Sequence, residues 1–142
     1  TIGLSMAHQA GRVVGVEVVP EAIENAKENA RKNGISNAEF FCGDASEAVR
    51  RFREEGKRPT VVVLDPPRKG CDEFMLQNLT AMEPLRIVYV SCNPATLARD
   101  VKRLEELGYH FEQGVAVDLF GGTAHVETVI WMSKNKQNHL EK

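Results

Sequence analysis

The chain has 142 residues, of which 42% are hydrophobic and 27% are charged, and its formal net charge is −2. This composition is typical of one soluble domain with a sizeable core, and no apolar run approaches the roughly 20 residues that span a bilayer. Three widely spaced cysteines argue against a disulfide framework or a zinc site and fit a reducing cytoplasm. The small net charge does not indicate nucleic-acid binding, so any basic face must be local or lie on another domain.

Strand and helix patterns alternate along the first half of the chain. In chain order, the predicted elements are a helix at 1–10, a strand at 12–19, a helix that Pro20 opens and Gly34 closes, a strand at 38–42, and a helix from about Ser46 to Glu55. The run RVVGVEVV at 12–19 is apolar at most positions, which predicts a buried strand.

The alternation continues through the second half and changes only at its end. The predicted elements are a strand at 60–65, a helix from about Asp72 to Met82, a strand at 86–91, a helix from Asn93 to near Gly108, and strands at 109–118 and 124–132. The β-branched run TVVVLD at 60–65 predicts a strand that is covered on both faces. Residues 133–142 read as a polar tail.

This order of elements predicts an α/β fold with a mostly parallel sheet and helices on both of its faces. The last two strands follow each other with only a short link between them. We therefore expect the last strand to run antiparallel to its neighbours.

Acidic residues follow or end the first three predicted strands, at the sheet edge where open parallel sheets bind ligands. Glu17 suits hydrogen bonds from the two hydroxyls of a ribose. Asp44 fits an approach to adenine and a helix N-cap equally well. Asp65 is a candidate for positioning a polar edge of a substrate or cofactor.

The three cysteines differ in their sequence surroundings. Cys92 follows a strand and precedes Asn93, a good N-cap, and Pro94, a good first helical residue. The positive end of that helix favours the nucleophilic thiolate. Cys42 lies inside a strand and fits a small buried hydrophobe, and Cys71 has no activating neighbour in the sequence. Cys92 is therefore the predicted nucleophile.

Glu127 is the candidate base for this nucleophile. It lies at the start of the last predicted strand, within the apolar run VETVIWM. An antiparallel last strand would begin at the edge where the parallel strands end, which brings Glu127 near Cys92. Buried carboxylates tend to have raised pKa values, which suits proton abstraction. His125 fits a second proton carrier or a structural histidine.

Three segments resemble the signature of RNA (uracil-5-)-methyltransferases, which modify 23S rRNA or tRNA. They are DPPRKG at 65–70, VSCNPATLARD at 90–100, and Phe120 followed by TAHVE at 123–127. The resemblance covers essentially the whole chain. It implies a Rossmann-like class I methyltransferase fold that uses S-adenosylmethionine (SAM), with Cys92 as nucleophile and Glu127 as base. It also implies that Glu17, Asp44 and Asp65 belong to the pocket for SAM and substrate.

The resemblance implies methyl transfer to C5 of a uridine, with 23S rRNA favoured over tRNA, in the cytoplasm and without a metal. The sequence departs from the family's pattern where Phe120 is followed by two glycines in place of proline. The family's first strand, glycine-rich SAM loop and N-terminal RNA-binding domain are expected before Thr1. Residues 1–132 would then be an N-terminally truncated catalytic domain, followed by the tail at 133–142.

Two alternatives to this function stay open. An RNA 5-methylcytosine or amino-group methyltransferase would carry a cysteine or an aromatic residue directly after the DPP motif, where this chain has Arg68. A non-catalytic fragment that only binds RNA or a partner protein is the second alternative. Measuring SAM binding would separate the two.

Overall fold

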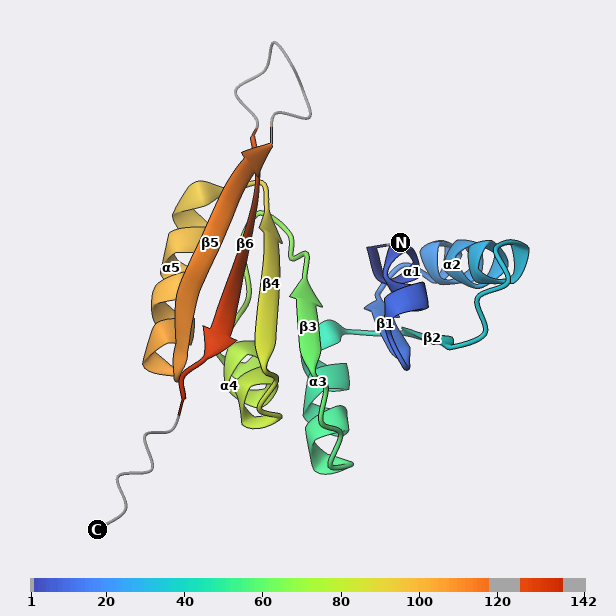
Figure 1. The fold of residues 1–142 in the computed structure, drawn as a ribbon, viewed down its shortest axis with the longest axis horizontal. Coiled ribbons are helices and arrows are strands. Elements are labelled where there is room, and N and C mark those ends of the chain that lie inside the picture. Colours follow the sequence, from blue (N-terminus) through green and yellow to red (C-terminus); the bar gives the residue numbers. More distant parts are fainter. Residues whose placement is uncertain (1, 118–125, 137–142) are drawn as a thin grey trace. The chain divides into compact units, whose positions relative to one another are not determined.

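The computed structural model describes residues 2–117 and 126–136 of the chain (Figure 1). The elements are α1 (Ile2–Ser5), a short 3-10 helix η1 (Ala7–Gln9), β1 (Val13–Glu17), α2 (Pro20–Lys32), β2 (Ala38–Cys42), α3 (Ala45–Glu54), β3 (Val61–Leu64), α4 (Glu73–Ala81), β4 (Arg86–Ser91), α5 (Pro94–Glu106), β5 (Tyr109–Val117) and β6 (Glu127–Lys134). The chain divides into two compact units, 1–51 and 52–142. The predicted helix at 1–10 is wrong as one element, because α1 and η1 are separate short helices.

In the first unit, β1 and β2 form a two-stranded parallel sheet with Val13 opposite Ala38. The helix α2 buries Ile23, Ala26 and Ala30 along one face. The predicted burial of the first strand is wrong, since Val14 is 43% exposed. Within the described residues β1 pairs only with β2.

The second unit contains a four-stranded sheet in the order β3-β4-β6-β5 (Figure 1). The strands β3 and β4 are parallel, and β6 runs antiparallel to both β4 and β5. The prediction of an antiparallel last strand is therefore confirmed. The six described strands lie in two hydrogen-bonded sheets, whereas the sequence pattern predicted one.

One face of the four-stranded sheet forms the core of the second unit. Ile87 and Tyr89 in β4 and Ile130 and Met132 in β6 are at most 4% exposed. The helix α5 lies over this face, because the Tyr89 hydroxyl donates a hydrogen bond to Asp100 in α5. The helix α4 joins α5 on the same side, and an ion pair between the two helices links Glu73 to Arg103.

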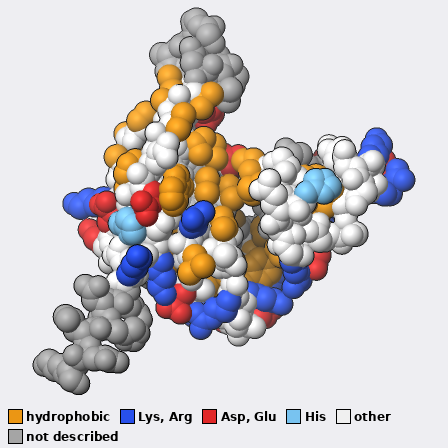
Figure 2. Space-filling model, in the orientation of Figure 1, with side chains coloured by type: hydrophobic (Ala, Val, Ile, Leu, Met, Phe, Trp, Pro, Cys, Tyr) orange, Lys and Arg blue, Asp and Glu red, His pale blue; other side chains and the backbone are white. Residues whose placement is uncertain are grey.

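The residues on the opposite face of this sheet are less buried than those of the core. Val63, Val88, Val129 and Trp131 lie on it and are only partly buried. Figure 2 shows hydrophobic side chains gathered over the strands of this unit. The helices α4 and α5 occupy one side of the sheet, and cover of the strand at 60–65 on its second face stays a prediction.

The end of the described chain also differs from the expected polar tail. β6 continues through Lys134, whose N–H donates to the Leu85 carbonyl (3.0 Å). Ser133 and Lys134 therefore belong to the sheet, and residues 137–142 of the expected tail lie outside the described residues. None of the helices in the described ranges has the length and apolar character needed to cross a bilayer.

Candidate active site

Cys92 occupies the turn between β4 and α5. Asn93 caps α5, because its Oδ1 accepts the Ala95 N–H (3.1 Å), and Pro94 is the first residue of this 13-residue helix. The Ser91 hydroxyl accepts the Asn93 N–H (3.1 Å) and donates to the Asn93 carbonyl (3.0 Å). The predicted cap is confirmed, and the turn holds a half-buried Cys92 at the N-terminus of α5.

The surroundings of the other two cysteines differ from those expected. Cys42 is exposed and is the last residue of β2. Its predicted burial is therefore wrong. Cys71 is the buried cysteine, with 7% exposure, and this burial raises the pKa of its thiol to about 11. At neutral pH Cys71 is a protonated, inaccessible thiol, which does not suit a nucleophile.

The antiparallel ladder between β4 and β6 brings Glu127 to the Cys92 turn. Val90 pairs with Val129 and Ser91 with Thr128, so Cys92 directly follows, and Glu127 directly precedes, the last pair of this ladder. Glu127 is half-buried and begins β6. Thiol and carboxylate thus come from adjoining strand ends, while their chemical roles stay predictions.

Several residues next to Glu127 lie outside the described residues. They are Phe120, Gly121, Gly122, Thr123, Ala124 and His125. The expectations for His125 and for the two glycines in this segment therefore stay predictions.

Asp65 lies at the carboxyl end of β3, beside the strand that leads to Cys92. Leu64 pairs with Tyr89 in the parallel ladder, so Asp65 leaves the sheet next to Val90. The side chain is exposed, and within the described ranges its carboxylate makes no hydrogen bond or ion pair. It is therefore available to a ligand.

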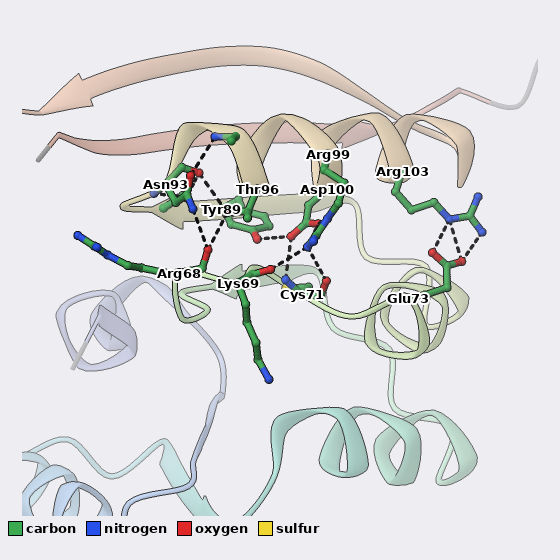
Figure 3. Close-up of polar contacts among 12 residues, drawn as sticks. Arg68, Lys69, Cys71, Glu73, Tyr89, Asn93, Thr96, Arg99, Asp100 and Arg103 are labelled. Atoms are coloured by element: carbon green, nitrogen blue, oxygen red, sulfur yellow. Dashed lines mark hydrogen bonds and ion pairs between the residues drawn. The ribbon is translucent and has the colours of Figure 1, made fainter.

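The loop that follows Asp65 is fastened to the first turn of α5 (Figure 3). The Asn93 side-chain amide and the Thr96 hydroxyl both donate to the Arg68 carbonyl, at 3.1 and 3.0 Å. These bonds hold the DPPRKG loop against the turn that carries Cys92.

Arg99 and Asp100 extend this fastening, although the sequence reasoning gave neither residue a role. The Arg99 guanidinium donates to the carbonyls of Lys69 (2.9 Å) and Cys71 (3.0 Å). Asp100 accepts the Cys71 N–H (2.8 Å) and the Tyr89 hydroxyl. Burial, followed by the hydrogen bond to Asp100, raises the pKa of Tyr89. The sequence does carry a signal for the burial of Asp100, since this residue shares one helix face with the apolar Leu97 and Leu104.

The acidic residues of the first unit lie at the carboxyl ends of β1 and β2. Glu17 ends β1 and is exposed, and its Oε1 accepts the Val19 N–H (3.0 Å). Asp44 accepts the Glu47 N–H through Oδ1 (3.0 Å) and the Ala48 N–H through its carbonyl. The structure therefore shows the capping contact for Asp44, and an adenine contact stays a prediction. In the described ranges no three His, Cys, Asp or Glu side chains gather as potential metal ligands.

Known sequences resemble most of this chain. The family model of tRNA (uracil-5-)-methyltransferases matches residues 1–135. An uncharacterized RNA methyltransferase of Bacillus cereus is 52% identical over 134 residues, which are 94% of this chain and 29% of that protein. One from Staphylococcus aureus is 54% identical over 129 residues, which are 91% of this chain and 28% of that protein. The chain thus spans less than a third of the length of these curated relatives.

Solved structures show the same fold. The Pyrococcus abyssi tRNA (uracil-54, C5)-methyltransferase, solved with S-adenosyl-L-homocysteine, is 34% identical, with a TM-score of 0.76 over 92% of this chain and 31% of that one. The magnesium protoporphyrin IX methyltransferase of Synechocystis, at 12% identity, shows the fold alone, with a TM-score of 0.72 over 94% of this chain and 68% of that one. The fold is that of class I SAM-dependent methyltransferases, and the match over residues 1–135 shows that this chain belongs to the tRNA (uracil-5-)-methyltransferase family.

Proposed function

We propose that the intact protein transfers a methyl group from SAM to C5 of a uridine in RNA, through a covalent bond between Cys92 and C6 of the uracil ring. The observation that carries this proposal is the register of β4 and β6, which brings Cys92 and Glu127 to adjoining strand ends. A thiol and a carboxylate are the nucleophile and base that this reaction needs.

The residues at the strand ends fit SAM. The Glu17 carboxylate uses Oε1 for the Val19 N–H, and its second oxygen can accept the ribose hydroxyls. The exposed Asp65 carboxylate can accept from a polar group of cofactor or substrate. When bound, SAM supplies an electrophilic methyl group.

Cys92 would act first. Its thiolate adds to C6 of uracil, and the electrons of the C5=C6 bond move toward O4 as an enolate. C5 thereby becomes nucleophilic enough to take the methyl group, which an unmodified uracil C5 does too slowly. Covalent attachment thus divides one difficult step into easier ones.

Glu127 would act last. Its carboxylate accepts the proton that C5 still carries, the C5=C6 bond re-forms, and the bond between C6 and the Cys92 sulfur breaks. The products are 5-methyluridine in the RNA and a free Cys92 thiolate.

The substrate is a uridine that lies outside a base stack, because an enzyme reaches C5 and C6 only in a flipped or single-stranded base. The signature segments favour 23S rRNA, and the solved relative of 34% identity is a tRNA methyltransferase by name. The relatives named as RNA methyltransferases support action on RNA, and the three widely spaced cysteines fit a reducing cytoplasm.

Methyl transfer from labelled SAM to transcripts of 23S rRNA and tRNA tests the proposal. We expect labelled 5-methyluridine in one of them with the intact protein, and none with Cys92→Ala. Labelled 5-methylcytosine or a methylated exocyclic amine would instead support the alternative methyltransferases. SAM binding without transfer to any RNA would support a binding role and contradict the proposal.

A further inference from the structure

Asp100 is a charged side chain inside the second unit. It is 1% exposed. Its Oδ1 accepts from Arg99 Nε (2.8 Å), and its Oδ2 accepts the Cys71 N–H and the Tyr89 hydroxyl. A buried ion pair is weak support for stability, because the cost of desolvation offsets much of the attraction. The informative property of this pair is therefore the backbone geometry that it fixes.

The pair fixes the backbone at residues 69–71. Arg99 binds the carbonyls on either side of Gly70, and Asp100 binds the N–H that follows it. Gly70 has φ +74°, and a Cβ at this position would lie 2.5 Å from Asp100 Oδ2 and 2.7 Å from Arg99 Nη2. Only glycine allows the loop to approach the pair this closely.

The start of α5 holds the same loop at a second place. Asn93, Thr96 and Asp100 are spaced i, i+3 and i+7, so they share one face of α5, and the first two bind the Arg68 carbonyl. The Tyr89 hydroxyl ties Asp100 to β4, the strand that leads to Cys92. Figure 3 shows these contacts in a row along the helix.

We propose that Arg99 and Asp100 are positioning residues, which hold the loop carrying Asp65 in a fixed place relative to the Cys92 turn without touching the substrate. The loop begins after β3 and the helix begins after β4, so the contacts along α5 lock the two strand ends together. This inference rests on the proposed function, because the geometry that Arg99 and Asp100 fix is the one in which Cys92 forms its adduct.

Arg99→Lys and Asp100→Asn in the intact protein test this inference, with Lys102→Ala on the exposed side of the same helix as control. RNA containing 5-fluorouridine traps the Cys92 adduct. Its C5 carries fluorine in place of the hydrogen that a general base removes as a proton from natural uridine. The maximal rate of adduct formation should fall about 10- to 100-fold. The RNA concentration at half-saturation and the affinity for SAM should stay close to those of the parent.

Arg99→Lys is the safer variant for folding, because the Arg99 side chain is 56% exposed. Gly70→Ala should reproduce the rate loss with both charged residues intact, and amide exchange at Cys71 should accelerate in Asp100→Asn. If the maximal rate falls only in proportion to the folded fraction, the pair is merely structural and the inference is wrong. A normal maximal rate in Arg99→Lys also overturns it. A parent protein that forms no adduct would instead refute the proposed function itself.

Discussion

Ser91 in β4 lies directly opposite Thr128 in β6. This pairing determines which chain segments meet at this end of the sheet, because β4 leaves the sheet at Cys92 and β6 enters it at Glu127. A parallel last strand would put its first residue at the far edge of the sheet. The reversed direction of β6 is therefore the feature of the fold that joins thiol and carboxylate.

Cys92→Ala should abolish the covalent adduct between the intact protein and 5-fluorouridine RNA in the presence of SAM. Cys92 is half-buried directly before the Asn93 cap of α5, whereas Cys71 is buried and Cys42 is exposed. Denaturing electrophoresis would show the adduct as a slower band. Cys71→Ala and Cys42→Ala are the matched controls and should keep it. If Cys92→Ala still forms the adduct and Cys71→Ala does not, Cys92 was wrongly assigned as the nucleophile.

Glu127→Gln should form the adduct but release product slowly, because glutamine cannot accept the C5 proton. With natural uridine RNA, a covalent species that already carries the labelled methyl group should accumulate. Mass spectrometry of the protein–RNA complex would detect it. Glu112→Gln, on the neighbouring strand β5, is a control. Free 5-methyluridine appearing at the parent's rate would exclude this role for Glu127.

The order of elements and the Cys92 turn could be predicted because local chemistry determines them. Pro20 begins α2 and Asn93 caps α5, and both follow from backbone preferences. Burial could not be predicted in the same way. Cys71 is buried because segments distant in sequence pack against it, whereas Val14 is exposed. The role of Asp100 was missed for the same reason, since its partner Cys71 is 29 residues away.

The raised pKa of Cys71 predicts unequal thiol labelling of the native protein at pH 8. With a pKa of about 11, roughly one Cys71 thiol in a thousand is ionised at that pH, and burial further limits access. Cys42 and Cys92 should react quickly with an aromatic disulfide reagent, and Cys71 only after denaturation. Because the folded-state pKa lies above the ordinary value, Cys71 favours the folded state below about pH 9, and this contribution fades toward pH 11. Rapid labelling of Cys71 at pH 8 would contradict its burial.

Asp44→Asn should preserve both stability and SAM affinity, whereas Asp44→Ala should cost about 1 kcal/mol of stability. The reason is that Asp44 Oδ1 caps α3 through the Glu47 N–H, and asparagine can make the same contact. Denaturant unfolding and calorimetry would measure the two quantities separately. Weaker SAM binding by Asp44→Asn, at unchanged stability, would show that the carboxylate charge acts on the cofactor as well.

The 142-residue chain by itself should bind SAM more weakly than its full-length Bacillus cereus relative. β1 and β3 are edge strands of their sheets in the described part of the chain, and Val14 and Val61 on them are 43% and 46% exposed. Unpaired strand edges leave backbone groups to water and weaken the sheet that positions Glu17. Calorimetry on the chain, on the relative, and on Glu17→Ala in this chain would compare the affinities. If the chain binds SAM as tightly as the relative and methylates uridine-containing RNA, the strand edges are less important for the site than their exposure indicates.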